Sequence, residues 1–525
     1  METRQFASAQ LSKSRISLEV AEYDKKLLSK GAGSIFVCNQ LLPGMDEPIL
    51  LSLLEQHFPH VRLLHPYPIA PPKSWRSHTV QPKGGKVKNA FFTNSFIKKL
   101  KKAVEDGLAV GLVLNFSDNP LTHLGKNMLR TQILRQLRRL GLPVTPIHLQ
   151  AERMPGGILR RAFPGLPHYL TGGKAHISVR VGNTISAKDI ASFRKHRLWG
   201  KFLQAKIFSL GSTFDIRPEQ FSGQKPVALQ PLNPPTDPAL IAAEIEALDP
   251  GKKVASRGEF DVFVAPFSAL PNTIFEIARL RELTFRAVGE GTGKSLDMDE
   301  YDMYYLQLII WDRDKKRLVG GYRMGEGDHI FERFGVNGFY TNSLFKMKKG
   351  FHPVLCEAIE LGRTYVVPEY QKHRLPLFLL WKGILHFLLA NPHYRFLIGP
   401  VSISKDFSEA SKGVIVEFVQ RFCFDKKRAK LVEPRKPFRA QIKAVDTGLL
   451  AESLHGEFDA LEALVESMEP SHFSVPILFR QYLRQNAKFI AFNVDPNFSN
   501  CLDGLMILDI AQLPSSTIEA LKQEK

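Results

Sequence analysis

The chain has 525 residues, of which 44% are hydrophobic and 23% are charged. This length exceeds one ordinary domain core, and the composition is typical of folded proteins, so we expect two domains and exclude wholesale disorder. Lysine and arginine outnumber aspartate and glutamate by 71 to 52, a net charge of +19, which favours a polyanionic partner. Nucleic acid, an anionic membrane surface and an acidic carrier protein are all compatible with this charge.

The cysteines and the apolar segments limit the cellular compartments in which we expect the protein. The four cysteines are scattered and show no CxxC or Cys/His spacing, so we expect neither zinc nor a disulfide framework, as in a reducing cytoplasm. The first 20 residues lack the apolar core of a secretory signal. The most apolar window, 375–390, is interrupted by Lys382 and His386 and falls short of the roughly 20 apolar residues of a membrane span. Any membrane contact should therefore be peripheral.

The first half of the chain alternates short apolar runs with amphipathic segments. The runs at 34–39 and 109–116 predict buried strands. The segments at 95–106 and 126–141 have helical spacing with basic outer faces. This alternation predicts an α/β domain over residues 1–216.

A proline-rich stretch separates the two halves. Residues 217–255 contain adjacent prolines at 234 and 235 and are typical of an extended, partly stiff linker. Residues 256–525 are predicted to form a mixed α/β domain. Its expected strands are 259–266, 304–312, 317–325, 487–495 and 504–510, and its first expected helix is 272–288.

Charged residues gather around these strands in three groups. The groups are Arg281 with Phe285; Asp297, Asp299 and Asp302; and Arg323 with Glu360 and Arg363. The members of the first group lie one helical turn apart and share a helix face. In a regular strand Glu360 and Arg363 point to opposite faces, unless a bulge re-aims one of them. Each group taken alone is also compatible with surface ion pairs.

The order of these groups resembles that in the acyl-homoserine-lactone synthases. The longer strings are more similar to the hemolysin-like ornithine-lipid and glycine-lipid N-acyltransferases. They are FRAVGEGTGKSLDMDEYDMYY, GFYTNSLF, ELGRTYVVPEYQKHRLPLFLLWKGI, LIGPVSIS and NVDPNFSNCLDGLMILD. Both families have the GNAT fold, so the resemblance implies a GNAT-type N-acyltransferase domain over residues 256–525.

In GNAT proteins a central strand leads into a phosphate-binding turn and then a helix. By resemblance QKHRLP is this turn, and Arg374 and Pro376 stand where glycines are usual. Exposed N–H groups at a helix start bind phosphate, and basic side chains add positive charge. The expected binding residues are Gln371, Lys372, His373 and Arg374. The missing glycines disfavour acetyl-CoA and suit the phosphopantetheine arm of an acidic acyl carrier protein, with the helix from Leu377 lining an acyl tunnel.

The chemistry implied by the resemblance is amide formation. A (3-hydroxy)acyl group would pass from acyl carrier protein to the amine of ornithine or glycine and give an aminolipid precursor, with no tightly bound cofactor and no metal. A guanidinium can grip a carboxylate, and a carboxylate can hold an ammonium and accept its proton. The substrate-binding candidates are Arg281, Phe285, Arg323 and Arg363, and the catalytic candidates are Glu360, Asp297, Asp299 and Asp302. Which carboxylate is the base stays open.

The first half resembles a different acyltransferase family. IFVCNQLLPGMDEPIL is similar to the first block of the lysophosphatidic acid acyltransferases, in which Asn-His is followed by Asp. Asn39 and Asp46 match, but Gln40 stands at the histidine position, and a neutral amide cannot take up a proton. The resemblance, over about residues 15 to 215, implies a glycerolipid acyltransferase-like α/β domain that is catalytically degenerate and binds lipid or serves as a scaffold.

Three functions follow from these features. One is a lipid-forming N-acyltransferase, including a bifunctional form that also O-acylates its product. The second is a signal synthase of the acyl-homoserine-lactone kind, and the third is a non-enzymatic basic protein. We expect no nucleic-acid partner, because the aromatic residues lie mainly in apolar runs rather than in basic stretches. The expected partners are acyl carrier protein, an amino acid and the anionic inner membrane of a bacterium, bound peripherally from the cytoplasm.

Overall fold

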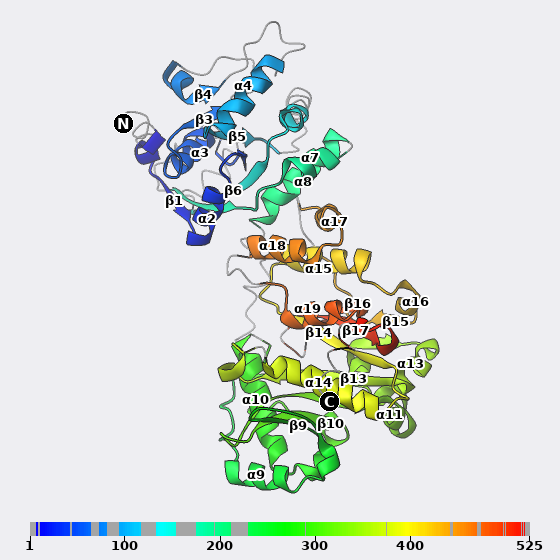
Figure 1. Cartoon of the computed structure of the whole chain (residues 1–525). Helices are drawn as coiled ribbons and strands as arrows, with labels where there is room; N and C mark the ends of the chain where they lie inside the picture. The colour runs from blue at the N-terminus through cyan, green and yellow to red at the C-terminus, as the bar shows by residue number, and fades with distance from the viewer. Residues whose placement is uncertain are drawn as a thin grey trace, which may run out of the picture. The chain divides into compact units, whose positions relative to one another are not determined.

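The computed structural model places most of the chain in two compact units (Figure 1). The first unit comprises Met1–Ile216, Glu409–Val414 and Gln441–Phe473, and the second comprises Arg217–Ser408, Ile415–Ala440 and Ser474–Lys525. The structure describes residues 7–8, 11–42, 45–64, 73–80, 94–116, 133–153, 175–193, 195–211, 229–288, 290–373, 375–440, 445–469, 474–496, 498, 500–515, 517 and 519.

The first unit is built on a seven-stranded sheet of order β1-β7-β6-β2-β5-β3-β4. Its strands are β1 (Ile16–Val20), β2 (Ile35–Asn39), β3 (Val61–Leu64), β4 (Thr79–Val80), β5 (Ala109–Leu114), β6 (Val144–Arg153) and β7 (Ala175–Val181). Neighbouring strands are parallel except β6 and β7. Strands β2 and β5 are buried along their whole length, which is why their sequences are continuous apolar runs.

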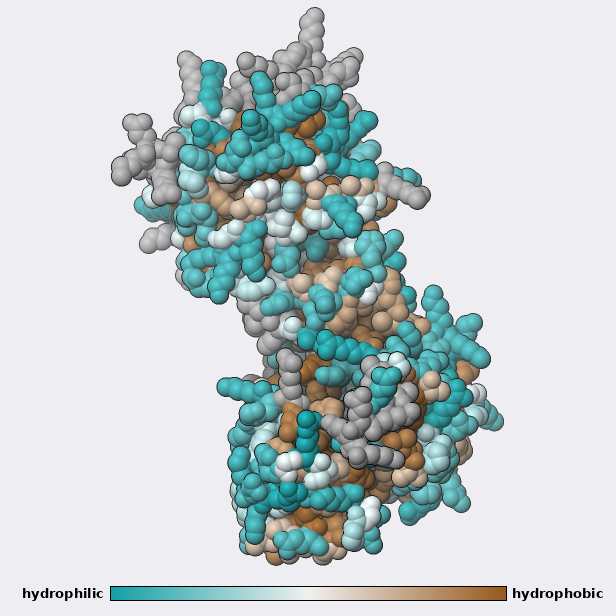
Figure 2. Space-filling model, in the orientation of Figure 1, coloured by the Kyte–Doolittle hydropathy of each residue, from teal (hydrophilic) through white to brown (hydrophobic). Residues whose placement is uncertain are grey.

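The helices of the first unit come from two separate stretches of the chain. They are α2 (Glu22–Lys30), α3 (Asp46–Glu55), α4 (Asn94–Glu105), α7 (Ala187–Ser192), α8 (His196–Ser209), α17 (Thr447–Glu452) and α18 (Phe458–Met468). Hydrophilic side chains cover much of the visible surface of this unit (Figure 2).

A buried ion pair ties α18 to the first sheet. The Arg180 Nε donates to Asp24 Oδ2 at 3.2 Å, and its Nη2 donates to the carbonyl oxygen of Ser467 at 3.0 Å. The side chains of this pair are 5% and 0% exposed. The second domain is therefore not the continuous segment 256–525 that the sequence predicted, because part of it completes the first unit.

The second unit is built on an eight-stranded sheet of order β16-β17-β14-β13-β11-β10-β9-β8. The strands are β8 (Lys253–Arg257), β9 (Phe260–Pro266), β10 (Leu306–Asp312), β11 (Arg317–Glu326), β13 (Ala358–Val366), β14 (Phe396–Ile403), β16 (Lys488–Asp495) and β17 (Cys501–Asp509). A two-stranded sheet pairs β12 (Phe345–Met347) with β15 (Val432–Pro434).

Strands β13 and β14 are the one parallel pair of the eight-stranded sheet, and they soon separate. Their register pairs Ala358 with Phe396 and ends where Glu360 meets Ile398. A side chain at Gly399 would lie 2.2 Å from the carbonyl oxygen of Leu361, so glycine permits the last close approach. Beyond this point β13 and β14 are no longer paired with each other.

The helices of the second unit cover both faces of its sheet. They are α9 (Pro238–Glu246), α10 (Thr273–Ala287), α11 (Gly327–Phe334), α12 (Tyr340–Leu344), α13 (His352–Cys356), α14 (Leu375–Ala390), α16 (Lys426–Ala429), α19 (Ile477–Arg484) and the part of α15 (Glu409–Phe422) from Ile415. Two consecutive residues of β13 point to opposite faces of the sheet. Thr364 bonds to Tyr322, and the Tyr322 hydroxyl lies 3.1 Å from the Tyr482 hydroxyl of α19. On the other face, Tyr365 lies near Arg281 of α10. None of the described helices combines the length and hydropathy that crossing a bilayer requires.

The predicted linker is partly folded into the second unit. Of residues 217–255 the structure describes those from 229, and they form helix α9 and edge strand β8. Helix α9 also positions α10, because the Glu244 carboxylate accepts the backbone N–H groups of Asn272 and Thr273 at 2.8 and 2.9 Å. The linker prediction was therefore wrong over this part, where proline marks a helix start.

Candidate functional site

Arg281 is the centre of a buried ion network in the second unit. Its Nη1 and Nη2 atoms donate to the two carboxylate oxygens of Asp302 at 2.8 Å each, and its Nε lies 3.1 Å from Asp297 Oδ2. The Arg281 and Asp302 side chains are 1% and 0% exposed. Burial raises the pKa of Asp302, but Arg281 outweighs burial and holds that pKa well below its usual range. Asp302 is therefore an anion that accepts no proton near neutral pH.

Arg323 joins this network from β11 and is almost wholly buried. It is 1% exposed, and its Nη1 donates to Asp299 Oδ1. Tyr301, Tyr305 and Tyr340 surround the guanidinium, each with its ring centroid 5.4 Å away. Cation–π contact with three rings compensates for the burial of the charge. Its geometry suits a structural role better than the carboxylate-binding role expected for it.

Arg363 is the arginine of this group that reaches solvent. Its side chain is 12% exposed, its Nε lies 3.0 Å from Asp297 Oδ2, and its Nη2 lies 3.4 Å from Asp299 Oδ2. The residue has a φ of +49°, next to an irregularity in the pairing of β11 with β13. This irregularity re-aims the side chain, as a bulge does, and places it on the network.

Glu360 lies beside the network but is fully engaged. Its Oε2 accepts the Tyr305 hydroxyl and the Tyr340 backbone N–H, and its Oε1 accepts the Thr341 N–H at 2.7 Å. It is 1% exposed, and burial raises its pKa. The carboxyl group thus anchors the start of α12, and the Tyr340 hydroxyl of α12 in turn accepts Arg363 Nη1 at 3.2 Å. Glu360 is arranged to position Arg363 rather than to meet a substrate.

A cavity of about 1010 Å³ opens beside this network. Phe285 lines it and packs edge-on against Phe498, with ring centroids 5.5 Å apart. The Arg363 guanidinium lies 5.3 Å from the same Phe498 ring. Its apolar wall includes Val288, Leu377, Phe378, Trp381, Leu385 and Ile477. The apolar helix α14 therefore serves both as a core element and as a cavity wall.

The expected phosphate-binding turn lies at this cavity. Gln371, Lys372 and His373 line it and are exposed, and the Gln371 side chain donates to the carbonyl oxygen of Val366 at 2.9 Å. Helix α14 begins two residues after His373. Arg374 lies outside the described residues. The described part of the turn thus places a lysine and a histidine before a helix N-terminus at the wall of an apolar cavity.

Sequence reasoning missed several residues that line or border the cavity. They are Thr284, Glu290, Tyr365, Trp381 and Asp503. None belongs to a group of charges with recognisable spacing, and their elements come together only in the folded unit. Four of them, Glu290, Tyr365, Trp381 and Asp503, fall within strings that carried the family resemblance.

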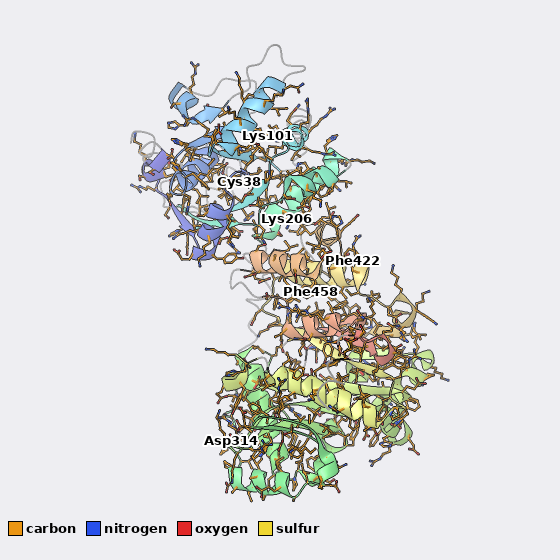
Figure 3. The ribbon with its side chains drawn as sticks, viewed as in Figure 1. Cys38, Lys101, Lys206, Asp314, Phe422 and Phe458 are labelled. Atoms are coloured by element: carbon orange, nitrogen blue, oxygen red, sulfur yellow. The ribbon has the colours of Figure 1, made fainter. Side chains whose placement is uncertain are left out.

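The residues expected at a degenerate site in the first unit hold backbone together. The Asn39 amide bonds to both backbone groups of Leu149, at 2.9 and 2.7 Å, and Gln40 Oε1 accepts the Asn115 amide at 2.7 Å. Asp46 accepts the N–H groups of Leu41 and Leu42 at 2.9 and 2.6 Å, and burial raises its pKa to about 6. Cys38, just before Asn39, lies inside this unit (Figure 3).

Comparison with known proteins agrees with the fold of the second unit. Residues 280–381 match the family model of the acetyltransferase (GNAT) domain. The chain is similar to a glycine Nα-acyltransferase of Phocaeicola vulgatus, with 27% identity over 277 residues that cover 50% of this chain and 83% of the relative. It is 31% identical over 214 residues to a glycine Nα-acyltransferase of Bacteroides thetaiotaomicron, covering 39% of this chain and 63% of that relative. The second unit thus contains a GNAT domain, and the chain is an acyltransferase.

Proposed function

We propose that the chain transfers an acyl group from the thioester of an acyl carrier protein to the amine of a small amino acid, glycine or ornithine, and forms an aminolipid precursor. The observation that carries this proposal is the cavity, which joins a cationic turn to an apolar wall. A phosphate-bearing arm needs the first feature, and a long acyl chain needs the second. The names of the two relatives favour glycine as the acceptor.

Each part of the cavity then has a chemical task. Lys372 and His373 attract the phosphate of the arm, and the apolar wall receives the acyl chain. Arg363, which lies beside the cavity and is 12% exposed, binds the carboxylate of the amino acid. The amine nitrogen attacks the thioester carbonyl, the C–N bond forms and the C–S bond breaks. No covalent enzyme intermediate is needed.

We further propose that the first unit binds anionic lipid without acylating it. Its Asn39, Gln40 and Asp46 side chains are engaged with other residues of the unit. Helix α4, on which Lys101 lies (Figure 3), carries four exposed lysines, Lys98, Lys99, Lys101 and Lys102. Each lysine near an anionic bilayer contributes about 1 kcal/mol. Reversal of all four to glutamate should abolish sedimentation of the chain with phosphatidylglycerol vesicles, and unchanged sedimentation would contradict a role for α4.

The test of the transferase proposal uses the purified full chain with hexadecanoyl-charged acyl carrier protein and glycine. We expect thiol release that depends on glycine, with N-hexadecanoylglycine detected by mass spectrometry. Lys372→Glu should raise KM for the charged carrier but not for a short thioester that lacks phosphate. The matched control is Lys349→Glu, an exposed lysine outside the cavity. Thiol release without amide would refute the proposal, and a soluble lactone product would favour the signal synthase.

A further inference from the structure

Two further acidic residues, Glu290 and Asp503, lie in or beside the cavity. Glu290 lines the cavity just beyond α10, and its backbone N–H donates to the carbonyl oxygen of Phe285 at 2.8 Å. Asp503 of β17 is 2% exposed, and its Oδ1 accepts the Ser402 hydroxyl at 2.7 Å from its partner position on β14. Asp503 interacts electrostatically with Glu290 and with Arg363. These two carboxyl groups therefore border the site that we assign to the acceptor.

Two buried hydroxyl groups line the same cavity as Glu290. The Thr284 hydroxyl and the Tyr365 hydroxyl line the same cavity, and their residues are 6% and 3% exposed. Neither hydroxyl has a hydrogen-bond partner in the described part of the chain. Buried polar groups are normally satisfied, so two such hydroxyls facing one cavity indicate a polar ligand.

The negative charge of Glu290, Asp503 and the end of α10 indicates that the ligand is a cation. Helix α10 ends at Ala287, and the C-terminal end of a helix carries a partial negative charge. Neither Glu290 nor Asp503 forms an ion pair with a residue that the structure describes, in contrast to Asp299 and Asp302. An ammonium group would satisfy both the carboxylates and the unpaired hydroxyls.

We propose that Glu290 binds the ammonium group of the acceptor and takes up the proton that this group must lose before it can attack. This inference rests on the proposed function and adds the base to it. Asp503 is a positioning residue that acts on Glu290 through its charge. The ammonium proton passes to the Glu290 carboxylate, and the freed lone pair attacks the thioester carbonyl carbon. As the C–S bond breaks, the second nitrogen proton goes to the leaving sulfur, and Glu290 returns its proton to solvent.

The ionisation of both groups agrees with this role. Burial raises the pKa of Glu290 to about 7, and Asp406 adds to the shift. Burial likewise raises the pKa of Asp503 to about 7, with Asp495 and Glu290 adding and Ser402 and Arg363 opposing. A general base is most effective when its pKa is near the working pH. The pKa of Asp302 in the ion network is instead held well below its usual range by Arg281, which outweighs burial.

The test compares Glu290→Gln with the wild type in the hexadecanoyl-carrier and glycine assay, as a function of pH. We expect kcat/KM for glycine to fall about 100-fold or more at pH 7, and the deficit to shrink at high pH, where free glycine is already deprotonated. Asp503→Asn should shift the acidic limb of the kcat/KM profile to lower pH, because removal of a negative charge lowers the pKa of Glu290. Asp509→Asn, on the same strand and paired with Arg395, should leave the profile in place.

Two results separate this inference from the proposed function. If the wild type makes amide and Glu290→Gln matches it across the pH range, Glu290 is not the base while the transferase proposal stands. If the wild type makes no amide, both fail. Binding of the charged carrier, measured for each variant, establishes that a slow variant is folded, and a slow, folded Glu290→Gln with a parallel rather than converging pH profile would also overturn the base role.

Discussion

Removal of Arg281 should destabilise the second unit strongly. The residue forms a two-point ion pair with Asp302 and contacts Asp297, and all three side chains are 0–2% exposed. Removing one partner of a buried ion pair leaves the other charge uncompensated, which costs about 3–5 kcal/mol. We therefore expect Arg281→Gln to lower the free energy of unfolding by this amount and Tm by about 6–20 °C.

A double-mutant cycle with Asp302→Asn tests the cause. If the cost is that of the orphaned carboxylate, the double variant should recover about 2 kcal/mol or more of the loss in Arg281→Gln. Hydrogen exchange in urea, read by mass spectrometry on peptides of β10 and β13, reports this unit separately. The matched control is Arg317→Gln, whose 3.0 Å partner Glu369 is 57% exposed, and this change should cost about 0–1 kcal/mol. Additive losses, or a loss equal to that of the control, would refute the reasoning.

Three further predictions concern the cavity and the first unit. Arg363→Lys should lower kcat/KM for glycine about 10-fold or more but leave that for ethylamine unchanged, because one ammonium cannot replace a bidentate fork; equal losses would contradict carboxylate binding. Leu385→Trp should shorten the preferred acyl chain in a competition between thioesters, whereas Leu389→Trp, 66% exposed and outside the cavity wall, should not. Burial raises the pKa of Asp46 to about 6, so its neutral form favours folding and stability falls as pH rises from about 4 to 6. Asp46→Asn should match the wild type at pH 4.5 and exceed it by about 1–3 kcal/mol at pH 8 in thermal unfolding; a deficit at pH 8 would contradict this sign.

The strands were predictable wherever burial left an apolar signature. The expected strands at 34–39, 259–266 and 304–312 correspond to β2, β9 and β10. Edge strand β8 was not expected, because most of its residues are partly or fully exposed and show no apolar pattern. The prolines of the predicted linker were ambiguous for a similar reason. Proline fits an extended connector, but it also fits the first turn of a helix, as Pro238 does in α9.

The residue types of the site were predictable, but their roles depended on local geometry. The expected arginines and aspartates do meet in one ion network. The sequence could not show that the Glu360 carboxylate accepts three hydrogen bonds, since the three donors lie far from it in the sequence. Nor could it indicate Glu290 and Asp503. A single acidic residue forms no motif with its sequence neighbours, and the groups that surround it come together only in the folded chain.

The path of the chain gives the first unit a role that does not require catalysis. The second sheet is completed by β16 and β17, but the chain reaches these strands only after Gln441–Phe473 has packed in the first unit. In α18 the side chains of Leu461, Leu464 and Val465 are 0–1% exposed, and burial of each contributes about 1.5–3 kcal/mol. Deletion of residues 1–216 would remove side chains that bond to the α18 backbone, among them Arg180 and Asn183. A first unit that performs no catalysis would therefore still be needed to keep α18 buried.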